Sequence, residues 1–228
     1  MNEKTKAYLA ALFFSAIIGF SFLFTKIALG YASPLTNLAH RYTIAALVMV
    51  VLHQTKLIKL SLSRKDILSI LPMSLFYPLF FFIFQSFALQ YISSSEAGIL
   101  QALVPIFTLL LASAFLKEKT SLLQKFFLFL SVTGVVFIFL SKGANFGTET
   151  ASFGFLLMLG SVLANAINNI LSKSTGGRYR AMDMTAVVIF VGFVTFNTLS
   201  LTSHYLEGNI LAYFCVLYTS DAADDTPC

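Results

Sequence analysis

The chain has 228 residues, of which 57% are apolar and 11% are charged. A soluble domain has about 25% charged residues, so this composition excludes an ordinary soluble protein. The net charge of +5 does not indicate nucleic-acid binding, because the basic residues lie beside apolar segments. The two cysteines cannot form a disulfide framework, and the three histidines are too far apart for a metal motif. We therefore expect a membrane protein without a cofactor or metal.

Seven apolar stretches have the length of a membrane-spanning helix. A hydrocarbon core about 30 Å thick needs about 20 helical residues, and these stretches lack the period-two alternation of barrel strands. We predict an all-α, multi-pass membrane protein and no soluble domain. The predicted spans, in chain order, are 7–29, 36–53, 67–89, 95–116, 122–140, 153–172 and 184–203.

The basic residues between the spans predict the orientation of the chain. Short connections rich in Lys and Arg stay in the cytoplasm, so the N-terminus is expected inside. The first span follows two lysines but is too long for the apolar region of a cleaved signal peptide. Twelve of the fifteen Lys and Arg residues lie at the N-terminus or in every second connection: Lys4, Lys6, Lys56, Lys59, Arg64, Lys65, Lys117, Lys119, Lys125, Lys173, Arg178 and Arg180.

Three prolines lie inside predicted spans. Each removes a backbone hydrogen bond and frees a carbonyl that needs another partner, so we expect kinks at these positions. They are Pro72 and Pro78 in the third span and Pro105 in the fourth.

A faint internal repeat has a spacing of 146–150 residues. Residues 15–18 align with 161–164, and the helix start at 33–36 aligns with 183–186, where Asp183 also suits a helix start. Because five spans separate the copies, the second copy crosses the membrane in the opposite direction. This is the inverted-repeat plan of many secondary transporters.

The repeat predicts the domain organisation. We expect a first five-helix half over 7–140 and the start of a second half, two spans and a stub, over 153–217. About seven of about ten expected spans would then be present. Residues 218–228 carry three acids that do not suit a lipid-embedded helix. We interpret them as a non-native tail on a truncated transporter.

The segment 87–140 carries a specific family likeness. It has the helix end Ala-Leu-Gln-Tyr at 88–91, a small-residue stretch at 93–98, Pro105 in the fourth span, Glu118 at its end and Gly134 in the fifth. This pattern resembles the EamA-type domain of the drug/metabolite transporter superfamily. The likeness covers one five-helix domain and the opening two helices of a second.

The resemblance implies a secondary transporter, or permease, for small metabolites such as amino acids or related compounds. It implies alternating access, outward transport and a bacterial cytoplasmic (inner) membrane, with proton coupling open. The expected partners are the lipid bilayer and a small-molecule substrate, with no nucleic acid, and a homodimer is compatible with this reading. The alternative is a seven-helix sensor or receptor, although a rhodopsin-like receptor has its N-terminus outside. The sequence has neither a nucleotide-binding phosphate loop nor a catalytic constellation, so an enzyme is not expected.

Three charged residues are predicted within or at the edge of the spans. Lys26, Arg41 and Glu96 all fall at similar depth in the outer half. Intramembrane charge is costly and usually faces protein or water, so the cations could attract an anionic or zwitterionic substrate and Glu96 could carry a proton. The alternative for the cations is that their long stems reach the outer headgroups.

Amide and phenol groups supply the other candidate substrate ligands. Asn165, Asn168 and Asn169 share one face of the sixth span, and three amides exceed what helix association needs. Gln101 in the fourth span is a candidate for which helix–helix hydrogen bonding is the leading alternative, as it is for Gln85. Tyr77 is the polar aromatic candidate of the third span.

Overall fold

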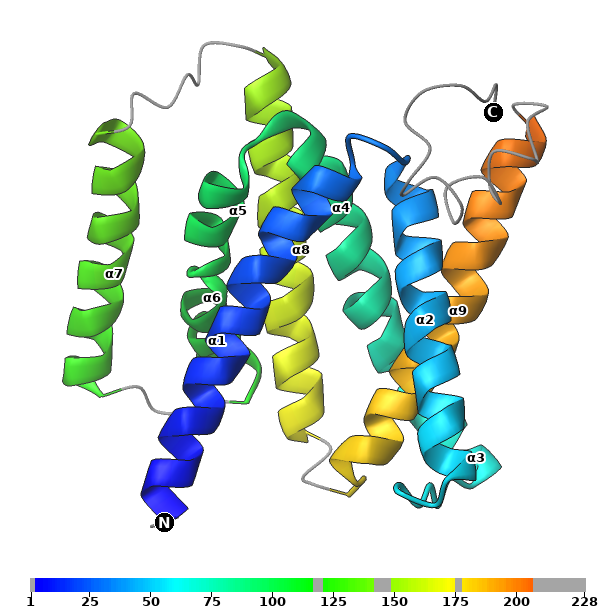
Figure 1. Ribbon diagram of the computed structural model, residues 1–228. Helices are drawn as coiled ribbons and strands as arrows, with labels where there is room; N and C mark the ends of the chain where they lie inside the picture. The colour runs from blue at the N-terminus through cyan, green and yellow to red at the C-terminus, as the bar shows by residue number, and fades with distance from the viewer. Residues whose placement is uncertain (1–2, 117–120, 142–148, 175–177, 207–228) are drawn as a thin grey trace.

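The computed structural model describes residues 3–116, 121–141, 149–174 and 178–206, which form a bundle of long helices (Figure 1). No strand occurs in this described part. By length and composition, it contains six helices able to cross a membrane. A further helix coincides with the predicted fifth span, and its apolar part over Leu122–Val135 is shorter. The protein is therefore a polytopic helical membrane protein, as the composition predicted.

The helices follow the predicted spans closely. Two of the spans consist of more than one segment, and the remaining five are single helices. In chain order the elements are α1 (Glu3–Ala28), α2 (Pro34–Gln54), α3 (Arg64–Ser74), the π-helical turn η1 (Leu75–Phe80), α4 (Phe81–Tyr91), α5 (Ser94–Gln101), α6 (Val104–Phe115), α7 (Leu122–Ser141), α8 (Glu149–Ser174) and α9 (Ala181–Leu206). Glu118, the stub at 207–217 and the tail at 218–228 lie outside the described residues.

The connections alternate between the two ends of the bundle. Figure 1 shows the start of α1 and the ends of α2, α6 and α8 at one end of the bundle, here called the lower end. In the sequence, basic residues flank these four helix ends. The first helix α1 ascends and α8 descends, whereas α2 descends and α9 ascends. Each helix thus runs opposite to the helix with which the faint repeat aligns it: α1 to α8, and α2 to α9.

The third and fourth spans are interrupted within their length. In η1, Tyr77 has an extended backbone (φ −137°, ψ 109°) and is followed by Pro78. The helix α5 ends at Gln101, and α6 begins one residue before Pro105. Because proline has no N–H, the carbonyls of Ser74 and Gln101 lack the partner that an α-helix would give them. Non-helical backbone at membrane depth is tolerated where it is enclosed by protein or lines a cavity.

Breaks therefore occur at two of the three predicted positions. Pro72 lies inside α3 without interrupting it. Beyond the first break, α8 supports the start of α4, because the hydroxyl of Ser161 donates to the carbonyl of Phe81 at 3.0 Å.

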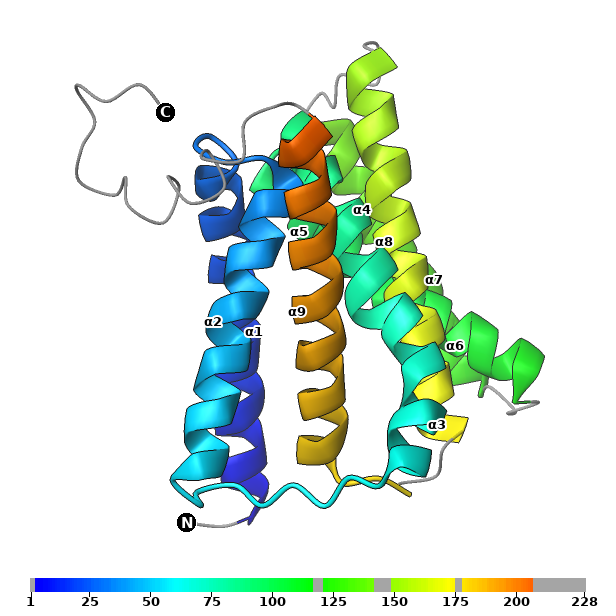
Figure 2. The same ribbon diagram turned by 90° about the vertical axis from the view of Figure 1, so that its right-hand side faces the viewer.

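Helices α2 and α9 pack side by side in antiparallel orientation (Figure 2). The buried ring of Tyr42 lies directly against Gly192, where an added Cβ would be 2.3 Å from Tyr42 Cε1. The same ring is 5.0 Å from that of Phe196 and 5.8 Å from that of Phe82, measured between centroids. The absence of a side chain at Gly192 is thus what lets these two helices approach.

Polar contacts fasten the same pair along its length. In the middle, the hydroxyl of Thr43 donates to Asn197 Oδ1 at 3.2 Å. At the upper end, Thr36 Oγ1 lies 2.8 Å from His204 Nε2. At the lower end, Asp183 accepts from the backbone N–H of Ser61 at 3.1 Å. The carboxylate of Asp183 therefore binds the connection after α2, where the sequence predicted a cap for its own helix.

Helix α8 lies at the centre of the bundle and packs against α3, η1, α4, α5 and α6. Small residues allow this approach: a Cβ added at Gly154 would lie 2.6 Å from Tyr91 Cβ, and one at Gly160 would lie 3.1 Å from the Phe84 ring. Ala164, which follows Gly160 on the same face, is buried. The small-residue face of α8 therefore serves close helix packing.

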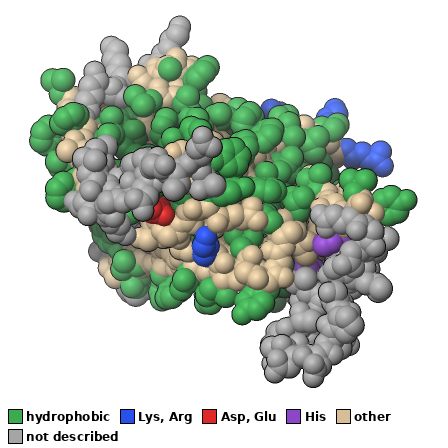
Figure 3. Space-filling model, turned by 90° about the horizontal axis from the view of Figure 1, so that it is seen from above, with side chains coloured by type: hydrophobic (Ala, Val, Ile, Leu, Met, Phe, Trp, Pro, Cys, Tyr) green, Lys and Arg blue, Asp and Glu red, His purple; other side chains and the backbone are tan. Residues whose placement is uncertain are grey.

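Helix α1 is attached mainly through its upper end. Lys26 Nζ donates to the carbonyls of Leu89 and Ile92 at the end of α4, and Ser94 Oγ donates to the carbonyl of Phe22 at 3.3 Å. By contrast, every residue over 12–20 is exposed in the bundle. Seen from above, hydrophobic side chains cover much of the visible surface (Figure 3). The exposed apolar side chains over 12–20, along the length of α1, suit lipid.

We predict that Gly192→Ala lowers the free energy of unfolding by about 1–3 kcal/mol, because the new methyl group overpacks against Tyr42. Thermal unfolding in detergent measures the change. Gly134→Ala is the matched control: an added Cβ there meets nothing within 4 Å, and alanine favours the helix by up to about 1 kcal/mol. Equal stability of Gly192→Ala and the parent chain would contradict the packing account.

Candidate functional site

A partly enclosed cavity of about 350 Å³ lies between α1, α2, the broken third span, the end of α5 and α8. It contains the six residues that the sequence predicted as substrate ligands, and Gln85 in addition. These residues come from five elements, so only the folded bundle brings them together. The predicted residues are Arg41, Tyr77, Gln101, Asn165, Asn168 and Asn169.

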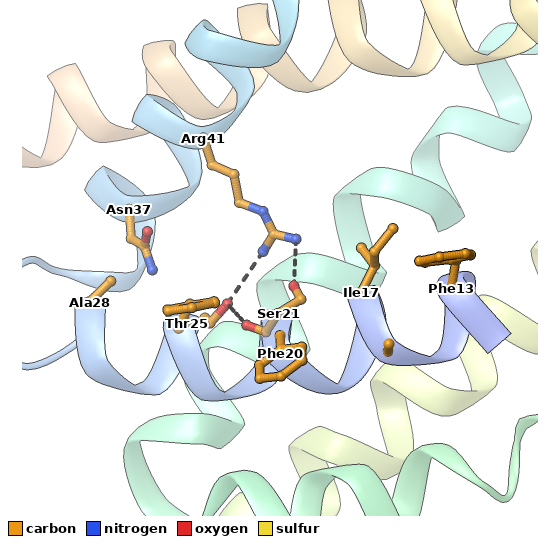
Figure 4. Close-up of a pocket in the computed structure, with 10 residues that line it drawn as sticks. Phe13, Ile17, Phe20, Ser21, Thr25, Ala28, Asn37 and Arg41 are labelled. Atoms are coloured by element: carbon orange, nitrogen blue, oxygen red, sulfur yellow. Dashed lines mark hydrogen bonds between the residues drawn. The ribbon is translucent and has the colours of Figure 1, made fainter.

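Arg41 extends from α2 towards α1, as Figure 4 shows. One terminal nitrogen donates to Ser21 Oγ at 3.0 Å, and the other donates to Thr25 Oγ1 at 3.5 Å. The guanidinium carbon lies 4.9 Å from the centre of the Phe82 ring, a distance at which a cation is attracted to an aromatic face. Arg41 is therefore held within the bundle by two hydroxyls of α1 and by the ring of Phe82.

Ser21 and Thr25 can hold this charge because they are four residues apart on α1 and so share a face. The Thr25 hydroxyl donates to the carbonyl of Ser21 at 2.6 Å, which leaves its oxygen free to accept from Arg41. Sequence reasoning did not select these two hydroxyls. The signal available in the sequence was a pair of hydroxyl residues, four apart in the first span, next to a second span that carries a cation.

Five amide groups also line the cavity. Asn165, Asn168 and Asn169 reach the cavity from α8, and Gln85 and Gln101 reach it from α4 and α5. The Oε1 atoms of both glutamines are buried and have no hydrogen-bond partner in the described part of the chain. Asn169 also donates to Thr108 Oγ1 on α6 at 3.3 Å, so it links helices as well as lining the cavity.

An aromatic cluster forms another part of the lining. Tyr77, whose backbone breaks the third span, has its ring centroid 5.1 Å from that of Phe81 and 5.4 Å from that of Phe82. Phe81 and Phe82 are themselves edge to face, 4.7 Å apart. The helix break thus turns one phenol and two phenyl rings towards the same cavity, beside Arg41.

Two further cavities adjoin this one. A cavity of about 710 Å³ shares Phe14, Ile18, Gln101, Asn165 and Asn169 among its lining residues and extends to the break before α6. Another, of about 580 Å³, lies between α1 and α2 and shares Ile17, Ser21 and Arg41 (Figure 4). Arg41 therefore stands at the boundary between the amide-lined cavity and a more apolar groove.

Lys26 and Glu96 lie outside the cavity lining. Lys26 binds the two carbonyls at the end of α4, where the negative end of a helix dipole favours a cation. Glu96 accepts from the backbone N–H and the hydroxyl of Ser93, both at 2.8 Å, and so forms the capping box that starts α5. Lys26 therefore stabilises the end of α4, and Glu96 stabilises the start of α5.

The electrostatics of the cavity follow from this distribution. Three carboxylates have side chains that the structure describes, and all three bind serines at helix starts or connections: Asp66 binds Ser63, Glu96 binds Ser93 and Asp183 binds Ser61. None of them lines the cavity. Among the described lining residues, Arg41 is the one charged group.

The chemistry of this arrangement suits the binding of a small polar or anionic molecule. The guanidinium provides fixed positive charge with several N–H donors, and the amides offer both donors and acceptors. No group of three His, Cys, Asp or Glu residues that could hold a metal occurs in the described part of the chain.

The family comparison agrees with this architecture. The model of the EamA-like transporter family matches residues 5–140. A Bacillus subtilis protein called uncharacterized transporter YcxC is 46% identical over 214 residues, which cover 93% of this chain and 68% of the relative. Another from the same organism, uncharacterized transporter YetK, is 26% identical over 96% of this chain and 68% of its own length.

Similarity extends to an archaeon. An uncharacterized transporter of Archaeoglobus fulgidus is 27% identical over 77% of this chain and 60% of its own length. No solved structure matches the chain. Taken with the broken spans and the polar cavity, the match over 5–140 and the identity to YcxC show that this chain belongs to the EamA-like transporter family.

Proposed function

We propose that the protein is a secondary transporter that moves small metabolites, such as amino acids or related compounds, out of the cell. The observation that carries the proposal is the cavity of about 350 Å³ at the two helix breaks, which is lined by Arg41 and five amides. Discontinuous helices around a polar site near mid-membrane are typical of secondary transporters. A volume of about 300–1,000 Å³ is typical of small-molecule sites.

Alternating access requires two groups of helices that can move relative to one another. In the proposed mechanism, the tightly packed pair α2 and α9 stays fixed. Helix α1, which is exposed over 12–20 and attached at its upper end, would move to open one side of the cavity. The proposed plan is two inverted five-helix halves, the first over 7–140 and the second beginning at 153. Within the described lining there is no carboxylate, so we assign no proton-carrying residue to this site.

The proposed orientation puts the N-terminus in the cytoplasm of a bacterial cell, because the helix ends that basic residues flank share the lower end of the bundle. The cavity would then accept substrate from the cytoplasm when the lower side is open. Release of the substrate on the outer side would complete the proposed outward transport.

Arg41→Ala and Asn168→Ala are each expected to reduce transport at least about tenfold, because each removes a direct ligand while the rest of the wall remains. Efflux of radiolabelled amino acids from proteoliposomes is the measurement, with the amount of inserted protein determined by immunoblot. Thr198→Ala is the control, since Thr198 is exposed on α9 and its hydroxyl binds only its own helix at Val194. Unchanged efflux in both cavity variants would refute the site, and no efflux in the parent chain would refute the function.

A reporter fused after Lys125 tests the orientation. Alkaline phosphatase is active only outside the cytoplasm, so we expect no phosphatase activity there and activity when the fusion follows Tyr31. The opposite pattern would reverse the proposed direction of access while leaving the helical bundle intact.

A further inference from the structure

The charge of Arg41 has no counter-ion among the described residues around the cavity. Its two hydrogen bonds go to the neutral hydroxyls of Ser21 and Thr25, and its flat face lies over Phe82. A guanidinium has five N–H donors, so further donors remain for another group. Neutral acceptors orient the charge without cancelling it.

Lys26 and Asp183 show what a satisfied ion in this bundle looks like. Lys26 has two backbone carbonyls at a helix C-terminus, and buried Asp183 has two donors from Ser61. Arg41 has the weaker set of partners and yet lines the space where a small molecule fits. A cation in a low-dielectric site needs a compensating anion.

We propose that the substrate supplies this anion: the cavity selects a small carboxylate with an aromatic or apolar body, and an ammonium group is not required. The inference rests on the proposed function and names its substrate class. The planar fork of an arginine matches the two oxygens of a carboxylate, which makes a paired, charge-assisted contact.

The position of the aromatic cluster indicates the body of the substrate. Tyr77, Phe81 and Phe82 lie within ring-contact distance of one another, and Phe82 also faces the guanidinium. A carboxylate bound to Arg41 therefore has these rings beside it. An aromatic ring on the substrate would stack against them, and the amides of Asn165 and Asn168, which line the same cavity, would contact polar substituents.

The same set of lining residues disfavours cationic substrates. A cation in this cavity is repelled by Arg41 and has amide oxygens as its strongest acceptors, because no acid is present in the described lining. A zwitterion binds through its carboxylate, and its ammonium group adds little. The cavity thus favours substrates that carry a negative charge over those that lack one.

Four probes that share a phenyl ring test the proposal: 3-phenylpropanoate (anion), 3-phenylpropanamide (neutral), 2-phenylethylamine (cation) and L-phenylalanine (zwitterion). Isothermal titration of the purified full chain in detergent at pH 7 measures binding. We expect the anion to bind about tenfold or more tightly than the amide, the zwitterion to bind like the anion, and the cation to bind most weakly.

Variants of the two intramembrane cations provide the controls. Arg41→Gln should remove the advantage of the anion over the amide, and Arg41→Lys should keep part of it, because the charge remains without the fork. Lys26→Gln is the matched control: it also removes an intramembrane cation, but one bound to the end of α4, so the order of the probes should stay the same. Circular dichroism verifies that each variant is helical.

Three results would overturn the proposal: the amide or the cation binds as tightly as the anion, none of the probes binds, or Arg41→Gln retains the preference. The binding test can fail or succeed independently of the transport test of the proposed function. Binding of the anion without vesicle transport would leave the site chemistry standing and remove transport, whereas transport of the cation in preference would leave a transporter with a different substrate class.

Discussion

Hydrocarbon cannot solvate a charge or an unpaired backbone group, and the whole arrangement of polar residues in this protein depends on that constraint. The buried Asp183 binds the connection after α2, and Lys26 binds the carbonyls at the end of α4. Each of these contacts joins two elements that are distant in sequence. In these cases, the contact that satisfies a polar group also holds two parts of the bundle together.

The constraint also explains where the helices can break. The breaks at Tyr77 and before Pro105 free backbone groups that lipid could not accept, and both lie beside the amide-lined cavity. Packing of α8 against the broken spans, through Gly154 and Gly160, keeps this irregular backbone enclosed. The cavity is thus the place where the bundle can have irregular backbone, polar side chains and a cation together.

Arg41 differs from the other described charges because its partners are hydroxyl groups and an aromatic face. It joins α2, α1 and α4, which are respectively part of a closely packed pair, a helix that is exposed over 12–20 and a segment that follows a break. A ligand that binds Arg41 would change the balance of contacts among these three elements. This gives a physical route from substrate binding to movement of α1.

Hydropathy was sufficient to predict the helices, because burial in lipid demands long apolar runs, and the alternation of basic residues matched the two ends of the bundle. Helical spacing also placed Asn165, Asn168 and Asn169 on one face. Periodicity cannot say which neighbouring helix a face meets, so the hydroxyls that hold Arg41 and the carbonyls that hold Lys26 were not foreseen. For Glu96 the coupling role stays a prediction, and the structure adds that it caps α5 in the motif that begins with Ser93.

The central claim is that a water-accessible, positively charged cavity exists inside an apolar bundle. The most direct measurement is labelling by an anionic, membrane-impermeant thiosulfonate of a cysteine placed at position 168, in a chain whose Cys215 and Cys228 are serine. The account predicts that Asn168→Cys reacts readily and that Val194→Cys, on an exposed apolar face of α9, does not. Equal inertness at both positions, or faster reaction at position 194, would contradict it.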